Sequence, residues 1–152
     1  MIILSIDSGI EKTGYAVFKD KRYLKSGLIT TEKTLATEKR LEKIYNELKK
    51  IVRQYSADKI ILEQLFFFKN QKTAIKVSQT QGIVLLLASQ NNINVSYLTP
   101  LQIKQIITGY GRADKKAVQK MIKLEYKIDI KQDDEADAVA CGLAFNLLRS
   151  CR

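Results

Sequence analysis

Four carboxylates stand where predicted strands and helices begin or end. Asp7 closes an isoleucine-rich run at the start of the chain, and Glu63 closes a second, unbroken apolar run. If the two runs are parallel strands, both carboxylates lie at the edge of the sheet where α/β proteins form their sites. Asp134 and Asp137 are three residues apart at the start of a predicted helix, so they share one of its faces.

Carboxylates gathered in this way could hold divalent metal. They would otherwise repel one another and raise one another's pKa values, and a hard cation such as Mg²⁺ is the natural compensation. Two magnesium ions about 4 Å apart could activate water and stabilise the leaving oxygen at a phosphodiester. We expect Mn²⁺ to substitute for Mg²⁺. The sequence has no histidine, and neither a paired-thiol motif nor a Ser/His/Asp set offers another hydrolytic mechanism.

Each of these acidic residues also has a structural interpretation. Asp134 and Asp137 could simply favour the dipole at a helix start, and Asp7, which Ser-Gly follows, could be a turn residue. Glu63 is harder to explain in this way, because a strand that is apolar on both faces seldom ends in a charge. Their joint occurrence at the ends of elements favours a site.

The composition indicates a polyanionic partner. The 152 residues carry 26 Lys and Arg against 16 Asp and Glu, a net charge of +10, and nucleic acid is the first partner to consider. A membrane surface is the competing polyanion, but no segment pairs a basic face with a large apolar one. We expect no signal peptide or membrane span and a cytoplasmic protein. The two cysteines, Cys141 and Cys151, predict neither a disulfide framework nor a zinc site.

Hydrophobic periodicity predicts an α/β fold in one domain over residues 1–152. An antiparallel opening followed by alternating strands and helices predicts a mixed five-stranded sheet flanked by helices. A Thr99-Pro100-x-Gln102 capping box opens one late helix, and Asp114 caps the next. The predicted strands cover 2–7, 13–18, 23–30, 58–63 and 93–98, and the predicted helices cover 38–55, about 71–90, 100–108, about 115–126 and about 134–149.

A series of segments resembles the RuvC-type Holliday junction resolvases. Ile6 to Tyr15, Ile61 to Phe66 and Asp134 to Ala138 are similar to the signatures of that family. Intervening segments resemble the family in the same order, so the likeness covers nearly the whole chain. These are Lys69-Asn70, Thr73 to Val77, Gln79 to Gly82, Thr99 to Gln105 and Thr108 to Lys115.

The resemblance implies a ribonuclease H-like fold, a homodimer and magnesium-dependent, paired symmetric nicking of four-way DNA junctions in recombination and repair. Asp7, Glu63, Asp134 and Asp137 would be the catalytic metal ligands, and a branch-migration helicase is a further partner that it suggests. The chain departs from the family in two places. Ser8 stands where proline is usual, and the histidine that many members have near the end of the last helix is missing.

Several residues are candidates for contact with DNA. Phe66, in a run of three phenylalanines, could stack on unpaired bases, although a place in the core is the alternative. Lys115 and Lys116 begin a helix, where the dipole disfavours cations, and a bound phosphate would explain them. Lys104 by itself reads as a solvated helix face, and the resemblance assigns it a DNA contact. The full candidate set is Phe66, Lys69, Lys104, Arg112, Lys115 and Lys116.

Alternatives remain open at this point. The chain could be a looser endonuclease of forks and branches, or a non-catalytic nucleic-acid-binding module on the same fold. Residues 7–14 also resemble a phosphate loop of actin-like ATPases and sugar kinases, but those proteins need two such domains around a nucleotide. The helix beginning near residue 71 is apolar all round at 83–88, which suits either a dimer interface or the core.

Overall fold

The computed structural model describes residues 1–65 and 71–150. The prediction of a mixed sheet flanked by helices is confirmed, and most predicted boundaries lie within one residue of the observed ones. In chain order the elements are β1 (Ile2–Asp7), β2 (Lys12–Lys19), β3 (Arg22–Thr30), α1 (Thr37–Tyr55), β4 (Lys59–Glu63), α2 (Gln71–Gln90), β5 (Asn94–Leu98), α3 (Pro100–Thr108), α4 (Lys115–Tyr126) and α5 (Asp133–Ser150).

The five strands form one sheet in the order β3-β2-β1-β4-β5. The first three are antiparallel neighbours, whereas β4 runs parallel to β1 and β5 runs parallel to β4. Ile6 is opposite Leu62 in the parallel pair, so Asp7 and Glu63 follow at the same edge of the sheet. On its other side Asp7 is opposite Gly14 of β2.

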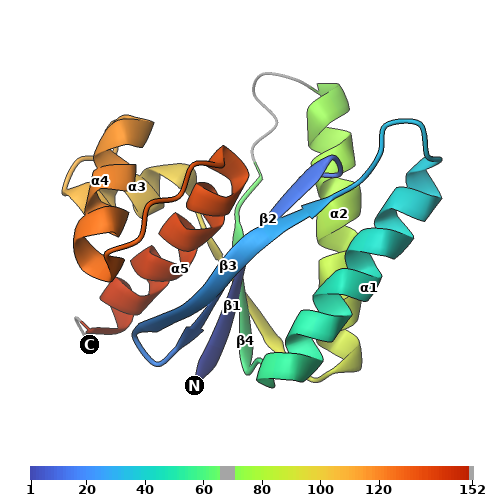
Figure 1. Ribbon diagram of the computed structural model, residues 1–152, viewed down its shortest axis with the longest axis horizontal. Coiled ribbons are helices and arrows are strands. Elements are labelled where there is room, and N and C mark those ends of the chain that lie inside the picture. The colour runs from blue at the N-terminus through green and yellow to red at the C-terminus, as the bar shows by residue number, and fades with distance from the viewer. Residues whose placement is uncertain (66–70, 151–152) are drawn as a thin grey trace.

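Helices cover both faces of the sheet, with α1 and α2 on one face and α3, α4 and α5 on the other (Figure 1). Successive residues of the central strands therefore enter different cores. Leu4 and Ile60 pack toward α1 and α2, while Ile3 and Ile61 pack toward the other three helices. Burial on both faces explains why the central strands are apolar without alternation.

The α1 helix is held by a regular apolar stripe and one buried cation. Ile44, Leu48 and Val52 recur every four residues and are buried against the sheet. Arg40, one turn earlier, is only 8% exposed, and its Nε donates a hydrogen bond to Thr31 Oγ1 at 2.8 Å. This bond ties the start of α1 to the segment that follows β3.

Small residues let α5 lie directly on the sheet. A Cβ atom on Gly142 would come within 2.1 Å of the Phe18 ring, and one on Gly14 would come within 1.9 Å of the Asp134 carbonyl oxygen. Between these points the Ser5 hydroxyl donates to the Ala138 carbonyl oxygen at 2.7 Å, inside the core. Gly14 is opposite Asp7 in the β1–β2 pair, so the absence of a side chain at Gly14 lets the first turn of α5 lie beside Asp7.

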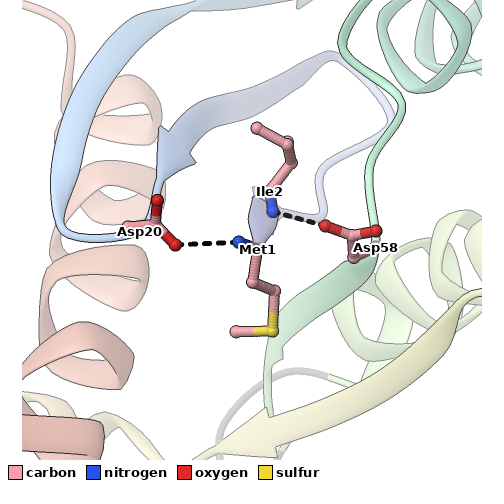
Figure 2. Close-up of polar contacts among 4 residues, drawn as sticks. All are labelled: Met1, Ile2, Asp20 and Asp58. Atoms are coloured by element: carbon pink, nitrogen blue, oxygen red, sulfur yellow. Dashed lines mark hydrogen bonds and ion pairs between the residues drawn. The ribbon is translucent and has the colours of Figure 1, made fainter.

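Polar contacts at the opposite edge hold the beginning of β1 (Figure 2). The amino group of Met1 lies 2.8 Å from Asp20 Oδ1, and the backbone N–H of Ile2 donates to Asp58 Oδ2 at 2.6 Å. Asp20 occupies the β2–β3 turn and Asp58 the segment just before β4. Both contacts fix β1 against its two neighbours and so help to set where Asp7 lies at the far end.

The helix boundaries on the α3–α5 face follow the predicted capping chemistry. Thr99 and Gln102 form the reciprocal capping box of α3. Asp114 caps α4 by accepting a hydrogen bond from the backbone N–H of Ala117 at 2.8 Å, and Gly109 ends α3 at a φ of 77°, which glycine adopts without strain. Over the described residues, no helix combines the length and apolarity that crossing a membrane requires.

We predict that Gly14→Ala lowers the free energy of unfolding by about 1–3 kcal/mol, because the new methyl group forces α5 away from β2. Thermal and urea unfolding measure this effect. Gly111→Ala is the matched control, since the atoms nearest to its methyl group would belong to the exposed side chains of Leu101 and Gln105 and not to backbone. Equal stability of Gly14→Ala and the wild type would contradict the account of how α5 is seated.

Candidate active site

The structure brings the four predicted carboxylates to one edge of the sheet. Asp7 and Glu63 come from the ends of the parallel neighbours β1 and β4, and Asp134 and Asp137 come from the first turns of α5. The charges of Glu63, Asp134 and Asp137 all act on Asp7. The two sequence patterns, strand ends and a shared helix face, thus converge in space.

Burial at this edge makes ionisation of Asp7 and Glu63 unfavourable. It is the largest cause of a rise in the pKa of Asp7 from 3.8 to about 8, with Asp137, Glu63 and Asp134 adding to it. The pKa of Glu63 is also raised, first by burial and then by Asp137, while Lys104 and Lys115 oppose the rise. Lysine charges are what oppose the rise, from Lys115 at Asp7 and from Lys104 and Lys115 at Glu63, and they do not cancel it.

Lys115 supplies part of that positive charge. Its Nζ lies 3.3 Å from Asp137 Oδ2 and 3.6 Å from Asp133 Oδ2. Burial raises the pKa of Asp137, and Lys115 opposes that rise. These two carboxylates also outweigh burial and raise the pKa of Lys115. Asp133 and Asp137 are therefore partners within the protein for Lys115, a cation in the first turn of α4. From the sequence, only a bound phosphate was expected to explain a lysine at this position.

Two hollows meet at Glu63. One, of about 180 Å³, is lined by Glu63, Asp137, Lys104 and Lys115 together with apolar side chains of α3, α4 and α5. The other, of about 260 Å³, has Asp7 and Glu63 on its wall beside Gln81. The Gln81 side chain donates to the Glu63 carbonyl oxygen at 2.9 Å and so fixes the end of β4.

The donor chemistry of the site fits a divalent cation such as Mg²⁺, which prefers carboxylate oxygens. Within residues 1–65 and 71–150, no three acidic, histidine or cysteine side chains converge closely enough to hold an ion as they stand. Lys115 engages Asp137, and the like charges oppose closer approach. Cys141 is buried close to this group, and burial, Glu63 and Asp7 all raise the pKa of its thiol.

The predicted DNA-contacting residues lie in three settings. Lys104 and Lys115 line the hollow that contains Glu63. Arg112, in the α3–α4 loop, and Lys116, exposed in the first turn of α4, are not among the described residues lining it. Phe66 and Lys69 lie outside the described residues.

Sequence reasoning missed two residues that shape the site. Asp133 shares Lys115 with Asp137, and its position next to Asp134 was the only available signal. Gln81 holds the backbone of Glu63 from the third turn of α2, and no local pattern indicates such a contact.

The raised pKa of Asp7 predicts how the metal-free protein responds to pH. The folded chain keeps this proton up to about pH 8, whereas the unfolded chain loses it near 3.8, so stability falls as pH rises between these values. We expect Asp7→Asn to raise the free energy of unfolding at pH 8 by about 1–3 kcal/mol.

Urea unfolding with chelator across this pH range measures the effect. Asp129→Asn, at a carboxylate that is 71% exposed, is the control and should leave the pH profile unchanged. A wild-type free energy of unfolding that rises with pH between 4 and 8 would refute the raised pKa of Asp7.

The comparisons with known proteins agree with this arrangement. The family model described as "Crossover junction endodeoxyribonuclease RuvC" matches residues 3–145. The curated relative of that name from Thermosipho melanesiensis is 43% identical over 146 residues, covering 92% of this chain and 93% of its own. That from Caldicellulosiruptor saccharolyticus is 42% identical over 157 residues, covering 99% and 95%.

Solved structures show the same fold. Thermus thermophilus RuvC in complex with a Holliday junction substrate superposes with a TM-score of 0.91 at 25% identity, covering 99% of this chain and 96% of that one. The fowlpox virus resolvase, solved with Holliday junction DNA, shares the fold with a TM-score of 0.61 at 19% identity, covering 94% and 97%. The ribonuclease H-like fold expected from the sequence is confirmed. By the match of its sequence over nearly its whole length, the chain belongs to the RuvC family of crossover junction endodeoxyribonucleases.

Proposed function

We propose that this protein is an endonuclease that resolves four-way DNA junctions by hydrolysing a phosphodiester bond in each of two opposed strands. The observation that carries the proposal is the partly buried group of carboxylates where β1 and β4 end, which neighbouring cations compensate only in part. The chain's curated relatives bear the name crossover junction endodeoxyribonuclease. Its basic charge of +10 suits a DNA substrate. Such a function places the protein in the cytoplasm, where a branch-migration helicase would be a natural partner.

Asp7, Glu63, Asp134 and Asp137 are the residues that would hold divalent metal, with Mg²⁺ as the expected ion and Mn²⁺ as a substitute. When bound, the metal supplies a Lewis acid for the attack of water on the phosphodiester and for the leaving oxygen. The burial that makes Asp7 hard to ionise favours ion uptake, because a cation relieves both the repulsion and the cost of desolvation.

The basic residues around this group would position the phosphate backbone. Lys104 and Lys115 border the same hollow as Glu63, so a phosphate at the carboxylates would lie within their influence. With a cation held by Asp137, Lys115 would be released from this carboxylate and could contact the DNA backbone instead. Arg112 and Lys116 would extend this contact along the backbone, and Phe66 and Lys69 are assigned to the junction by resemblance alone.

Two symmetric cuts call for two sites related by a two-fold axis, so we propose a homodimer. The α2 helix offers the surface. Val84, Leu87 and Ala88 are buried in the core, while Leu85 and Leu86 on its other side are 42% and 53% exposed. An apolar pair on the outer side of a helix that already packs on the sheet is typical of an interface.

Cleavage of a labelled four-way junction tests the function directly. We expect paired nicks with Mg²⁺, none with chelator, and no cutting of a linear duplex of the same sequence. Glu63→Gln and Asp7→Asn should each lower the rate by about a thousandfold or more while junction binding persists, since they remove metal ligands and not DNA contacts.

Glu125→Gln, at an exposed glutamate of α4, is the matched control and should cut normally. Full activity in both site variants would exclude the metal-site assignment. Tight junction binding without cutting by the wild type would indicate a non-catalytic module, and cutting of every branched substrate would indicate a general branch nuclease.

The dimer is tested by Leu86→Glu. A charge in an apolar interface should shift the protein from dimer to monomer in sedimentation velocity, because the carboxylate would have to be desolvated. Leu124→Glu on α4, where leucine is 63% exposed, is the control and should leave the dimer intact. A wild-type protein that sediments as a monomer at micromolar concentration would rule out the proposal.

A further inference from the structure

A third hollow adjoins the site on the face of the sheet that α1 and α2 cover. It has a volume of about 730 Å³, and Asp134 is one of its lining residues. We call it the β1–β2 groove, because the loop between those strands forms one wall. Its lining residues are Gly9, Ile10, Glu11, Lys12, Lys33, Arg40, Thr73, Lys76, Val77 and Asp134.

The charge of this groove is predominantly positive. Lys12, Lys33, Lys76 and Arg40 line it against only Glu11 and Asp134. Lys33 lies 3.3 Å from Glu11, but its side chain is 74% exposed, so water screens that pair strongly. In the part of the chain that the structure describes, no carboxylate lies within ion-pair distance of Lys12 or Lys76.

The wall that carries Lys12 is held rigidly by internal hydrogen bonds. The Thr31 hydroxyl accepts from Arg40 and donates to the Ile10 carbonyl oxygen. The Thr31 backbone N–H donates to the Glu11 carbonyl oxygen at 3.0 Å, and Thr13 Oγ1 donates to the Gly9 carbonyl oxygen at 2.6 Å. Arg40 thereby works as a structural support, and the loop needs no reorganisation to present Lys12.

We propose that the β1–β2 groove binds the sugar–phosphate backbone of the DNA arm that leaves the cut site on the α1–α2 side. Lys12, Lys33 and Lys76 come from β2, the β3–α1 loop and α2, so the cations surround the groove and suit several phosphates rather than one. The described lining contains no aromatic side chain on which a base could stack. The contact therefore positions DNA without reading its sequence.

This inference rests on the proposed function and adds a second DNA-binding surface, on the other side of the carboxylates. Lys104 and Lys115 border the carboxylates from α3 and α4, whereas the groove borders them from the opposite face of the sheet. A strand whose scissile phosphate lies at the carboxylates would then meet lysines both before and after it. Such support on two sides fixes the phosphate against the site.

The test is the salt dependence of junction binding by the Lys12→Gln/Lys76→Gln variant. Binding of a fluorescent four-way junction is followed by anisotropy with chelator present, so that no cutting occurs. Loss of two phosphate contacts should weaken binding about tenfold near 0.1 M salt and lower the slope of log affinity against log salt by about two. With Mg²⁺, KM for cleavage should rise by a similar factor while kcat changes little.

Two further variants separate a local contact from a change in net charge. Lys19→Gln/Lys21→Gln removes the same charge at the opposite edge of the sheet, where Lys19 is opposite Ile2, and should bind nearly as the wild type does. Lys12→Arg/Lys76→Arg should restore the slope. If Lys12→Gln/Lys76→Gln matches the wild type or the edge control, the groove assignment is wrong while the nuclease function stands. If the wild type itself fails to bind the junction, both fall together.

Discussion

The close approach of α5 to the sheet is the constraint on which the site depends. Asp134 and Asp137 belong to a helix, Asp7 and Glu63 to strand ends, and only a short helix–sheet distance brings the two pairs together. Gly14 supplies that distance, because any side chain there would overlap the Asp134 carbonyl. Gly142 and the Ser5–Ala138 hydrogen bond hold the next turns in the same register. The geometry of the acidic group is therefore set by residues that carry no charge.

That geometry imposes an electrostatic cost, and the neighbouring residues offset only part of it. Burial acts on Asp7, Glu63 and Asp137 alike, and Lys115 is the cation in direct contact with one of them. Carboxylates that lack nearby cations destabilise the fold, but they are suited to binding a metal cation. Stability and function often oppose each other in this way at functional sites. The hydrogen bonds at the other end of β1, from Met1 and Ile2 to Asp20 and Asp58, connect this strand to the segments beside it.

Much of this arrangement could be predicted from the sequence, because it depends on local pattern. The apolar run ending in Glu63 indicated a strand buried on both faces, and parallel strands place their ends at one edge. The spacing of Asp134 and Asp137 fixed a common helix face. Contacts between distant elements left no local signal. Nothing in the sequence indicated that Gln81 would hold Glu63, that Asp133 would share Lys115, or that lysines from three elements would surround one groove.

The segment from Asp7 to Gly14 shows why a motif needs its structural context. As a sequence it also suits a phosphate loop of nucleotide-binding proteins, which requires backbone N–H groups and hydroxyls open to a ligand. Here Thr13 is fully buried and its hydroxyl donates within the turn to Gly9. The space in front of Gly14 is filled by the backbone of α5. Gly14 is used instead to seat α5, and Thr13 to hold the β1–β2 turn, which leaves Asp7 to act with the carboxylates of that helix.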